Sequence, residues 1–276
     1  MSVKKTLLFV GYGSMAKAIA LGIASSDLKN KYHIEITGRD TQKAQKFIEE
    51  NHLGDVATIH PPFMHEISSQ SSLHGSSGRL DVDGKIVILC VKPYALGSFV
   101  YFGKAHSVYS VLAGVGMEML KQHIQATNYA KIMPNVGARF QKSSTAVYIE
   151  GDIQEEAREI ISSFGCAVFV DSESLVDASI ATGGSSPAFL ALIAQALIDA
   201  GVREGLKRDD ALKLVRATFE GFANLLAEQS PDTIIAAITS PGGTTIEGLS
   251  VLEDRAVRGA VIEACHRAVA KSRQKH

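Results

Sequence analysis

The stretch Gly11-Tyr12-Gly13-Ser14-Met15-Ala16 constrains the fold of this chain most, because it stands between a strand pattern and a helix pattern. The apolar run Thr6–Val10 precedes it and the helical run Ser14–Ser25 follows. In such a unit the first glycine makes the tight turn, the second lets a pyrophosphate approach the backbone, and a small third residue lets helix and strand pack closely. The spacing predicts a dinucleotide-binding turn; the alternative is a glycine turn kept for packing alone.

Strand-like and helix-like runs alternate through residues 1–171. Such alternation is typical of parallel βαβ units in a doubly wound sheet, so we expect an α/β fold with an N-terminal Rossmann-type domain over 1–171. The segment Pro61–Gly84 fits poorly; we expect an irregular helix around Met64–Ser68 and then a surface loop. The expected strands are 6–10, 33–37, 85–91, 107–112, 130–133, 146–149 and 167–170, and the expected helices are 14–25, 41–51 and 155–164.

After Asp171 the pattern is helical only, which predicts an all-α domain over 172–276. The run Glu173–Leu206 is almost uniformly apolar, and a helix that is apolar on every side must be buried on every side. The helices that follow are too few to surround it. We therefore expect a second copy of the chain to cover it in a homodimer, with a higher oligomer left open.

The tip of the second strand bears on the choice of cofactor. NAD enzymes place Asp or Glu there for the ribose hydroxyl, whereas an arginine suits the 2′-phosphate of NADP. Here Arg39 is the first long side chain after the strand, Glu35 lies inside the strand, and Asp40 reads as a helix N-cap. NADPH is favoured and NADH stays possible, with Arg39 as a solvated loop charge the alternative.

Composition excludes several classes of function. Lys and Arg number 28 and Asp and Glu 29, a net charge of −1, so nothing favours nucleic acid or an anionic membrane as a partner. The three cysteines are far apart and no metal-ligand spacing is present, so we expect no metal. Lys4 and Lys5 before an apolar run imitate a secretory signal, but Gly11, Gly13 and Lys17 interrupt it. We expect a soluble cytoplasmic protein.

A second glycine-rich turn lies near the C-terminal end. Pro241-Gly242-Gly243-Thr244-Thr245 precedes a helical pattern, and the N-terminus of a helix suits a small carboxylate. The plain alternative is a turn that caps a helix. The longer stretch Thr239–Leu249 resembles the signature of pyrroline-5-carboxylate reductases.

Further segments carry the same resemblance in the same order. They are Val91-Lys92-Pro93, Ser110–Val115, Met133-Pro134-Asn135 and Gly184–Phe189. The chain departs from the family pattern at Val136-Gly137, where Thr-Pro is usual, and at Gly183, Ser186 and Ala237. These departures leave the core signature intact.

The resemblance implies an NAD(P)H-dependent oxidoreductase that reduces the C=N bond of 1-pyrroline-5-carboxylate to proline, the last step of proline biosynthesis. It implies that Thr245 orients the ring nitrogen, and that the Thr244-Thr245 loop of one chain faces the cofactor of the other. The implied substrate-binding residues are Gly243, Thr244, Thr245, Glu173 and Glu228, the two glutamates having the alternative of helix-end surface carboxylates. The implied cofactor-binding residues are Gly11, Gly13, Ser14, Met15, Arg39, Val91, Lys92, Pro93, Ala113, Gly114 and Asn135.

Two other functions remain as alternatives. A β-hydroxyacid dehydrogenase shares the Rossmann-plus-helical plan but uses a lysine on its long central helix, and Gly183–Ala200 contains none. A noncatalytic NADP-binding sensor could keep the fold, and the change at Val136-Gly137 permits it.

Overall fold

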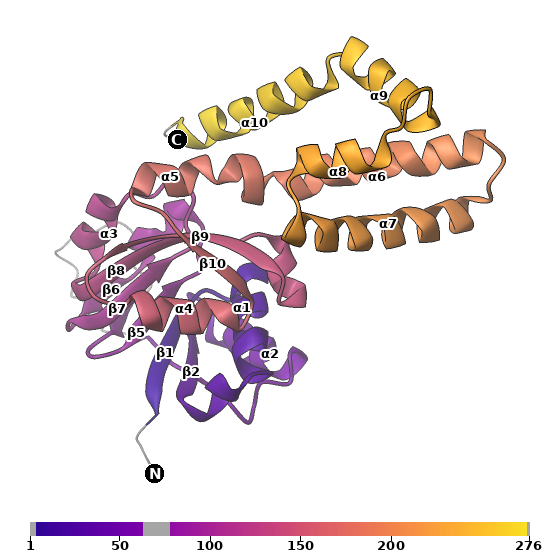
Figure 1. Ribbon diagram of the computed structural model, residues 1–276. Coiled ribbons are helices and arrows are strands. Elements are labelled where there is room, and N and C mark those ends of the chain that lie inside the picture. The colour runs from indigo at the N-terminus through magenta and orange to yellow at the C-terminus, as the bar shows by residue number, and fades with distance from the viewer. Residues whose placement is uncertain (1–3, 63–77, 275–276) are drawn as a thin grey trace. The chain divides into compact units, whose positions relative to one another are not determined.

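A computed structural model describes residues 4–62 and 78–274 (Figure 1). The expected helix around Met64–Ser68 lies outside these residues. By its internal contacts the chain divides into two compact units, residues 1–184 with 269–276, and residues 185–268. The first unit holds the sheet and the second is helical.

The first unit is built on an eight-stranded sheet in the order β10-β9-β8-β7-β5-β1-β2-β3. A separate parallel pair joins β4 (Arg79–Asp81) to β6 (Val100–Phe102). The strands of the large sheet are β1 (Lys5–Val10), β2 (Tyr32–Thr37), β3 (Ala57–Ile59), β5 (Ile86–Leu89), β7 (Ala105–Ser110), β8 (Ala126–Met133), β9 (Ser143–Glu150) and β10 (Gly165–Phe169).

Six of these strands run parallel to one another, from β3 through to β8, as the alternating pattern predicts. The pair β8–β9 is antiparallel, so β9 and β10 run the other way. The reason is the short connection over residues 134–142, which holds only the 3₁₀ helix η3 (Val136–Phe140). A parallel crossover needs roughly a dozen or more residues, so this connection can only reverse the chain.

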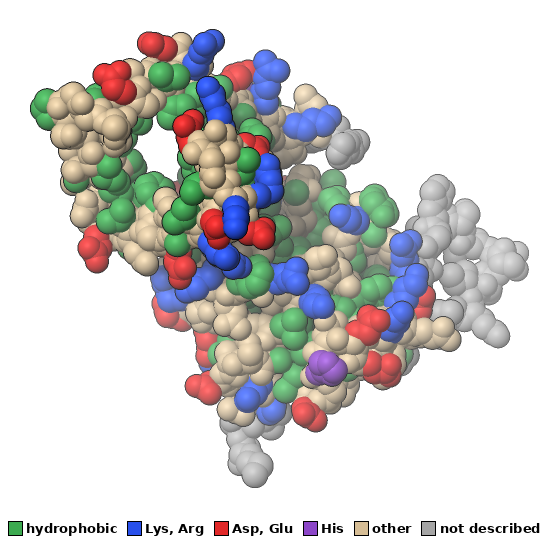
Figure 2. Space-filling view, turned by 90° about the vertical axis from the view of Figure 1, so that its right-hand side faces the viewer, with side chains coloured by type: hydrophobic (Ala, Val, Ile, Leu, Met, Phe, Trp, Pro, Cys, Tyr) green, Lys and Arg blue, Asp and Glu red, His purple; other side chains and the backbone are tan. Residues whose placement is uncertain are grey.

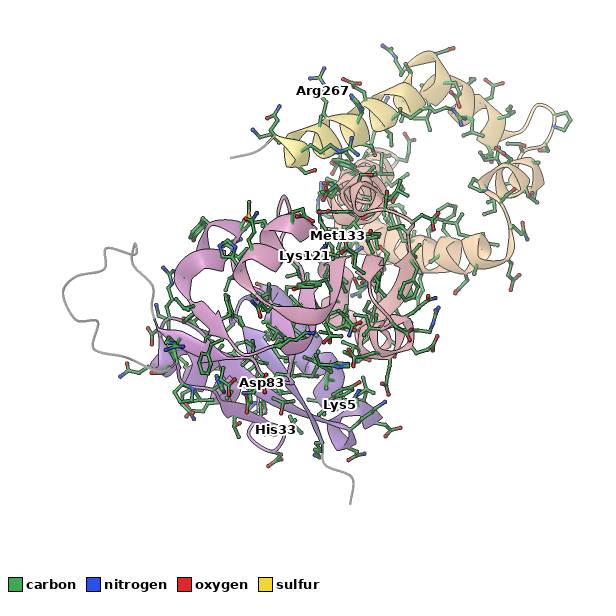
Figure 3. All side chains as sticks on the ribbon, turned by 90° about the vertical axis from the view of Figure 1, so that its left-hand side faces the viewer. Lys5, His33, Asp83, Lys121, Met133 and Arg267 are labelled. Atoms are coloured by element: carbon green, nitrogen blue, oxygen red, sulfur yellow. The ribbon has the colours of Figure 1, made fainter. Side chains whose placement is uncertain are left out.

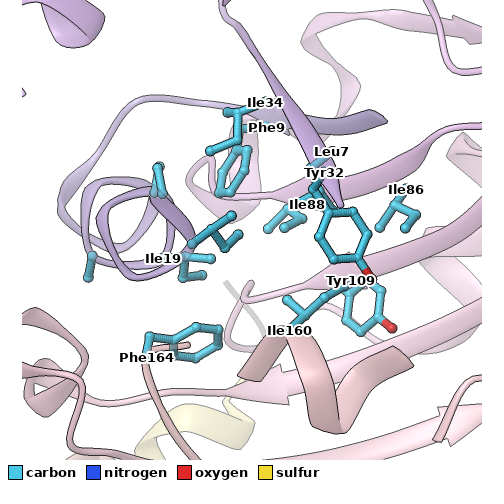
Figure 4. Close-up of a cluster of buried hydrophobic side chains, with 14 of the residues drawn as sticks. Leu7, Phe9, Ile19, Tyr32, Ile34, Ile86, Ile88, Tyr109, Ile160 and Phe164 are labelled. Carbon is cyan, nitrogen blue, oxygen red and sulfur yellow. The ribbon is translucent and has the colours of Figure 1, made fainter. Parts of the chain in front are cut away.

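Both faces of the sheet are buried, which explains the continuous apolar runs Leu7–Val10 in β1 and Ile86–Leu89 in β5. Along β1, Leu7 and Phe9 belong to one core cluster while Leu8 and Val10 belong to another, because side chains alternate between the faces of a strand. Figure 4 shows the first cluster, where Phe9 and Phe164 lie near the helix that carries Ile19. A sheet covered on both faces is the doubly wound arrangement.

Helices flank the sheet, and all but the last of them lie between its strands along the chain. They are α1 (Ser14–Ala24), α2 (Thr41–Glu50), α3 (Met117–His123), α4 (Gln154–Ser162) and α5 (Glu173–Ala178), with short 3₁₀ turns η1 (Asp27–Asn30) and η2 (Pro93–Ser98). The predicted helices over 14–25, 41–51 and 155–164 are confirmed to within two residues at each end. The short elements β3, β4, β6 and α3 are not apparent in the sequence, because three to seven residues give too little period.

The helical unit contains α6 (Ser186–Arg203), α7 (Arg208–Glu228), α8 (Pro231–Ile238), α9 (Thr244–Asp254) and most of α10 (Val257–Arg273). Within the apolar run 173–206 the chain forms three pieces, namely α5, a π-helical turn at Ile180–Gly184, and the long helix α6. The pair Gly183-Gly184 and the following Pro187 account for this break, since both residue types weaken a continuous helix.

Within one chain α6 is largely uncovered. Ile198 is its one buried residue, while Leu190, Leu192 and Leu197 are 46–70% exposed. Figure 2 shows hydrophobic side chains at the surface of the helical unit. By length and composition the segment Glu173–Arg203 could also cross a membrane, although a helix that packs inside a protein passes the same test. Exposed apolar area of this extent marks a surface that something covers.

Candidate active site

The glycine turn lies at the point where the sheet reverses its direction of growth. From β1 the chain builds β2 and β3 on one side, then returns to build β5, β7 and β8 on the other. Open α/β sheets bind ligands in the crevice at such a switch point. Gly11 follows β1 there with φ of 109°, and a Cβ on it would lie 2.7 Å from the carbonyl oxygen of Cys90, which follows β5. A residue other than glycine would be strained and would collide with the neighbouring loop.

The first helix begins beside this turn with its N-terminus open. Gly13 is the N-cap of α1, has no side chain to cap it, and is exposed with φ of −80°. Ser14 and Met15 follow as the first helical residues, whose N–H groups lack carbonyl partners within the helix. A Cβ on Gly13 would meet only the Cys90 carbonyl oxygen, at 4.0 Å. These residues fit a dinucleotide, because exposed N–H groups and a side-chain-free approach are what a pyrophosphate requires.

The other predicted cofactor residues follow neighbouring parallel strands at the same edge of the sheet. Arg39 follows β2, Val91-Lys92-Pro93 follows β5, Ala113 and Gly114 follow β7, and Asn135 follows β8. Figure 3 shows Met133, at the carboxyl end of β8, at the opposite end of the sheet from Lys5 at the start of β1. The topology thus brings the predicted cofactor residues to one edge.

The tip of β2 carries an exposed arginine. Arg39 is exposed, and Asp40 caps α2 by accepting a hydrogen bond from the Lys43 N–H at 3.0 Å, as predicted. Glu35 Oε2 lies 2.8 Å from Lys85 Nζ and 2.9 Å from His60 Nδ1. Burial alone would raise the pKa of Glu35, but these hydrogen bonds lower it to about 2. Its carboxylate is therefore held ionised in its own ion pair within the strand.

Asn135 holds the turn after β8 together. Its Nδ2 donates to Ser144 Oγ and to the Gly183 carbonyl, both at 3.0 Å, and its Oδ1 accepts from the Gly137 N–H at 2.9 Å. A Cβ on Gly137 would lie 2.6 Å from the Lys142 carbonyl oxygen. The departure Val136-Gly137 thus belongs to a tight turn in which position 137 has no room for a side chain.

Sequence reasoning missed a buried charged cluster next to this turn. Lys131 on β8 is 2% exposed, and its Nζ lies 3.2 Å from Glu173 Oε1 and 3.0 Å from Asp177 Oδ1, both on α5. Glu173 Oε1 also accepts a hydrogen bond from the Met117 N–H at 3.1 Å. The signal that could have found the cluster is a lysine inside an apolar strand run, since a buried charge needs partners.

The second glycine turn lies in the helical unit. Gly242 has φ of 68°, and Gly243 is the N-cap of α9 with its own N–H donated to the Ser240 carbonyl at 2.9 Å. Thr244 and Thr245 are the first residues of α9 and are exposed, so their N–H groups are among those at the open first turn. The glycine turn therefore leads into the N-terminus of a helix, as the sequence predicts.

Three further features bear on the chemistry, namely Glu228, the cysteines and the absence of a metal-binding cluster among the described residues. Glu228 is the last residue of α7 and is exposed. No disulfide joins Cys90, Cys166 and Cys265, and burial raises the pKa of Cys90 to about 12. Within 4–62 and 78–274, no group of three or more His, Cys, Asp or Glu side chains could hold a metal ion.

The fold and the glycine turn at its switch point are those of a Rossmann-type dinucleotide-binding protein. Residues 6–114 match the family described as NADP oxidoreductase, coenzyme F420-dependent, and residues 173–275 match pyrroline-5-carboxylate reductase dimerisation. The chain is 45% identical over 270 residues to a pyrroline-5-carboxylate reductase of Helicobacter pylori, covering 97% of this chain and 98% of the relative. It is 30% identical to that of Aquifex aeolicus, covering 96% and 95%. The chain belongs to the pyrroline-5-carboxylate reductase family.

Solved structures agree in fold. The 1-pyrroline-5-carboxylate reductase of Streptococcus pyogenes matches with a TM-score of 0.78 at 28% identity, covering 99% of each chain. The Plasmodium falciparum enzyme, solved with NADP bound, matches with a TM-score of 0.68 at 21% identity, covering 98% of this chain and 97% of that one. At 21% identity, the match to the Plasmodium falciparum structure shows a shared fold only.

The substitution Gly13→Ala tests the nucleotide crevice without disturbing the fold. The new methyl group meets nothing closer than 4.0 Å in the protein, so the variant should fold, with its unfolding temperature lowered only by the small cost of Ala in place of Gly at a helix N-cap. The methyl would occupy the path of the pyrophosphate, so the Kd for NADPH should rise by about 10-fold or more, a loss comparable to one charge-assisted hydrogen bond. Fluorescence titration measures it, with Gly54→Ala as the control, because a Cβ there has open space around it. An unchanged Kd would place the pyrophosphate elsewhere.

Proposed function

We propose that this protein reduces the C=N bond of 1-pyrroline-5-carboxylate to L-proline with NADPH, as the last step of proline biosynthesis. The observation that carries the proposal is the 45% identity to a pyrroline-5-carboxylate reductase over nearly the whole chain. Two local features support it, the open N-terminus of α1 at the switch point and the Gly-Gly-Thr-Thr start of α9.

The sheet unit binds and orients the cofactor in this proposal. When bound, the reduced nicotinamide supplies the hydride, and the protein supplies placement and electrostatics. The N–H groups of Ser14 and Met15 hold the pyrophosphate across the gap left by Gly11 and Gly13. The turns Val91–Pro93 and Ala113–Gly114, with Asn135, line the same edge toward the nicotinamide end.

The start of α9 holds the substrate. The N–H groups of Thr244 and Thr245 and the positive end of an eleven-residue helix attract the substrate carboxylate. Gly243 has given its N–H to Ser240, so its contribution is the close approach that a missing side chain allows. The Thr245 hydroxyl orients the ring nitrogen; a neutral threonine is a poor acid at pH 7, so it positions the nitrogen rather than protonating it fully. Glu228 is the proposed carboxylate near this site.

The alternatives fit less well. The helix α6 carries no lysine, which a β-hydroxyacid dehydrogenase would need there. A noncatalytic sensor would bind NADPH but not turn over substrate. We further propose a cytoplasmic location with neither nucleic acid nor membrane as a partner, supported by a net charge of −1.

The test is turnover. Purified protein should oxidise NADPH when 1-pyrroline-5-carboxylate is added and should form proline in equal amount. Thr245→Ala should lower kcat by about 10-fold or more with NADPH affinity near wild type, because the lost contact lies at the reacting centre. Thr244→Ala is the matched control, since a contact through its backbone N–H survives the change. NADPH binding without turnover would favour the sensor, and wild-type kinetics for Thr245→Ala would remove that residue from the reaction.

Arg39 determines cofactor preference in this proposal. It is exposed at the tip of β2, and the one acid inside that strand is held by Lys85 and His60. Arg39→Ala should weaken NADPH by about 1.5–3 kcal/mol, the usual loss of a charged hydrogen-bonded pair, and leave NADH nearly unchanged. Kd values for both cofactors measure this. Equal losses would show that Arg39 does not bind the 2′-phosphate.

We propose the homodimer as the working form, with a nucleotide-binding domain over 1–171 and a dimerisation and substrate domain over 172–276. The match to the dimerisation family over 173–275 and the exposed leucines of α6 support this division. Two-fold symmetry is the commonest way for a chain to cover its own apolar face.

Light scattering should therefore give twice the chain mass of 29.5 kDa, or an even multiple of it. If each active site uses the sheet of one chain and the α9 start of the other, mixing Arg39→Ala and Thr245→Ala chains under subunit exchange should restore part of the activity with NADPH. An active monomer would contradict the dimer. A dimer without complementation would leave each site within one chain.

A further inference from the structure

The loop that carries Ala113 and Gly114 is fixed by buried anchors on both sides of an exposed tip. Leu112, Val115 and Met117 are each 2% exposed and belong to the second core cluster. Ala113 and Gly114 between them are exposed, and Gly114 has φ of 76°. The position of the tip thus depends on how firmly its flanking residues are held.

The helix that follows this loop begins without a cap of its own. Gly116 is the N-cap of α3 and has no side chain that could accept a hydrogen bond from the first turn. The Met117 N–H therefore has no partner within the helix, and a buried N–H left unpaired is costly. Glu173 of α5 supplies the acceptor, with its Oε1 3.1 Å from the Met117 nitrogen.

The Glu173 carboxylate is itself held in place. Its Oε1 also accepts from Lys131 Nζ at 3.2 Å, and this ammonium is 2% exposed and is bound on its other side by Asp177. A Cβ on Gly116 would lie 3.1 Å from Glu173 Oε1, so the loop backbone and the carboxylate are in direct contact. One carboxyl oxygen thus joins the strand β8, the helix α5 and the end of the Ala113–Gly116 loop.

We infer that Glu173 is a positioning residue for the cofactor, an inference that rests on the proposed cofactor site at Ala113–Gly114. It acts from outside the site, by capping the Met117 N–H and so fixing the loop. The family resemblance implies a substrate contact for this residue, whereas its observed contacts are with the backbone of the cofactor loop and with Lys131.

Asp177 provides the matched control. It contacts the same lysine from the same helix, and no hydrogen bond joins it to Met117. Glu173→Ala and Asp177→Ala each remove one of the two carboxylates that pair with Lys131, so both variants change the charge around Lys131 by the same amount. Glu173→Gln keeps an acceptor oxygen and removes only the charge.

The experiment compares NADPH Kd, substrate KM and hydrogen exchange of the Met117 amide in the full-length protein. Glu173→Ala should raise the Kd for NADPH by about 10-fold and speed exchange at Met117, because a hydrogen bond to a charged acceptor is lost. Glu173→Gln and Asp177→Ala should stay within about threefold of wild type in Kd, since the cap survives in both. If Glu173→Ala does not fold, Gly116→Ala decides: a Cβ there lies 3.1 Å from Glu173 Oε1, so the carboxylate must shift by a few tenths of an ångström, which should lengthen the Met117 hydrogen bond and raise the same Kd and exchange rate.

Three results would overturn the inference. A raised KM for the imine with an unchanged Kd for NADPH would make Glu173 a substrate ligand. Equal effects of the two alanine variants would reduce its role to charge balance around Lys131, and unchanged exchange at Met117 would remove the cap. Failure of the proposed function is separate, because wild-type protein would then bind NADPH without turnover while the exchange comparison still stands.

Discussion

The contact on which the rest of the structure depends is the close approach of two loops at the switch point. A missing side chain at Gly11 lets the backbone after β1 pass the Cys90 carbonyl after β5, at a distance that no Cβ would tolerate. Directly after this approach the chain enters α1, with Gly13 as its N-cap. The chain turns one way from β1 and returns on the other side, which is the topology at which open α/β sheets bind ligands, and the glycine lets the turn there be tight.

The loops at this edge of the sheet are exposed, yet buried groups that flank them fix their positions. Leu112, Val115 and Met117 hold one loop, and the amide of Asn135 holds another through three hydrogen bonds. Lys131 adds a buried charge between them, satisfied by two carboxylates of α5. Breaking such a pair on one side is strongly destabilising, because it leaves a charge without a partner. The edge of the sheet is therefore rigid where a cofactor would need rigid contacts.

Much of this could be predicted from the sequence, because the informative features are local. The apolar run Thr6–Val10 followed by Gly11 and Gly13 can be recognised within a dozen residues. The doubly wound fold follows from the alternation of strand-like and helix-like runs after it. The features that could not be predicted depend on partners distant in sequence. Nothing local shows that Lys131 meets α5 or that Glu173 reaches Met117. The reversal at β9 could have been seen in the short connection after β8, but the strand pattern alone does not give direction.

The helical unit leaves much of its apolar surface exposed in a single chain. Leucines along α6 stand about half exposed, while Ile198 is the one residue of that helix that the chain buries. Even a few hundred Å² of such surface corresponds to several kcal/mol at about 25 cal/mol per Å². That amount is comparable to the net stability of a whole domain, so covering this face would contribute strongly to the stability of the unit. A chain with a net charge of −1 has little electrostatic repulsion to oppose such an assembly, and its apolar face provides the driving force.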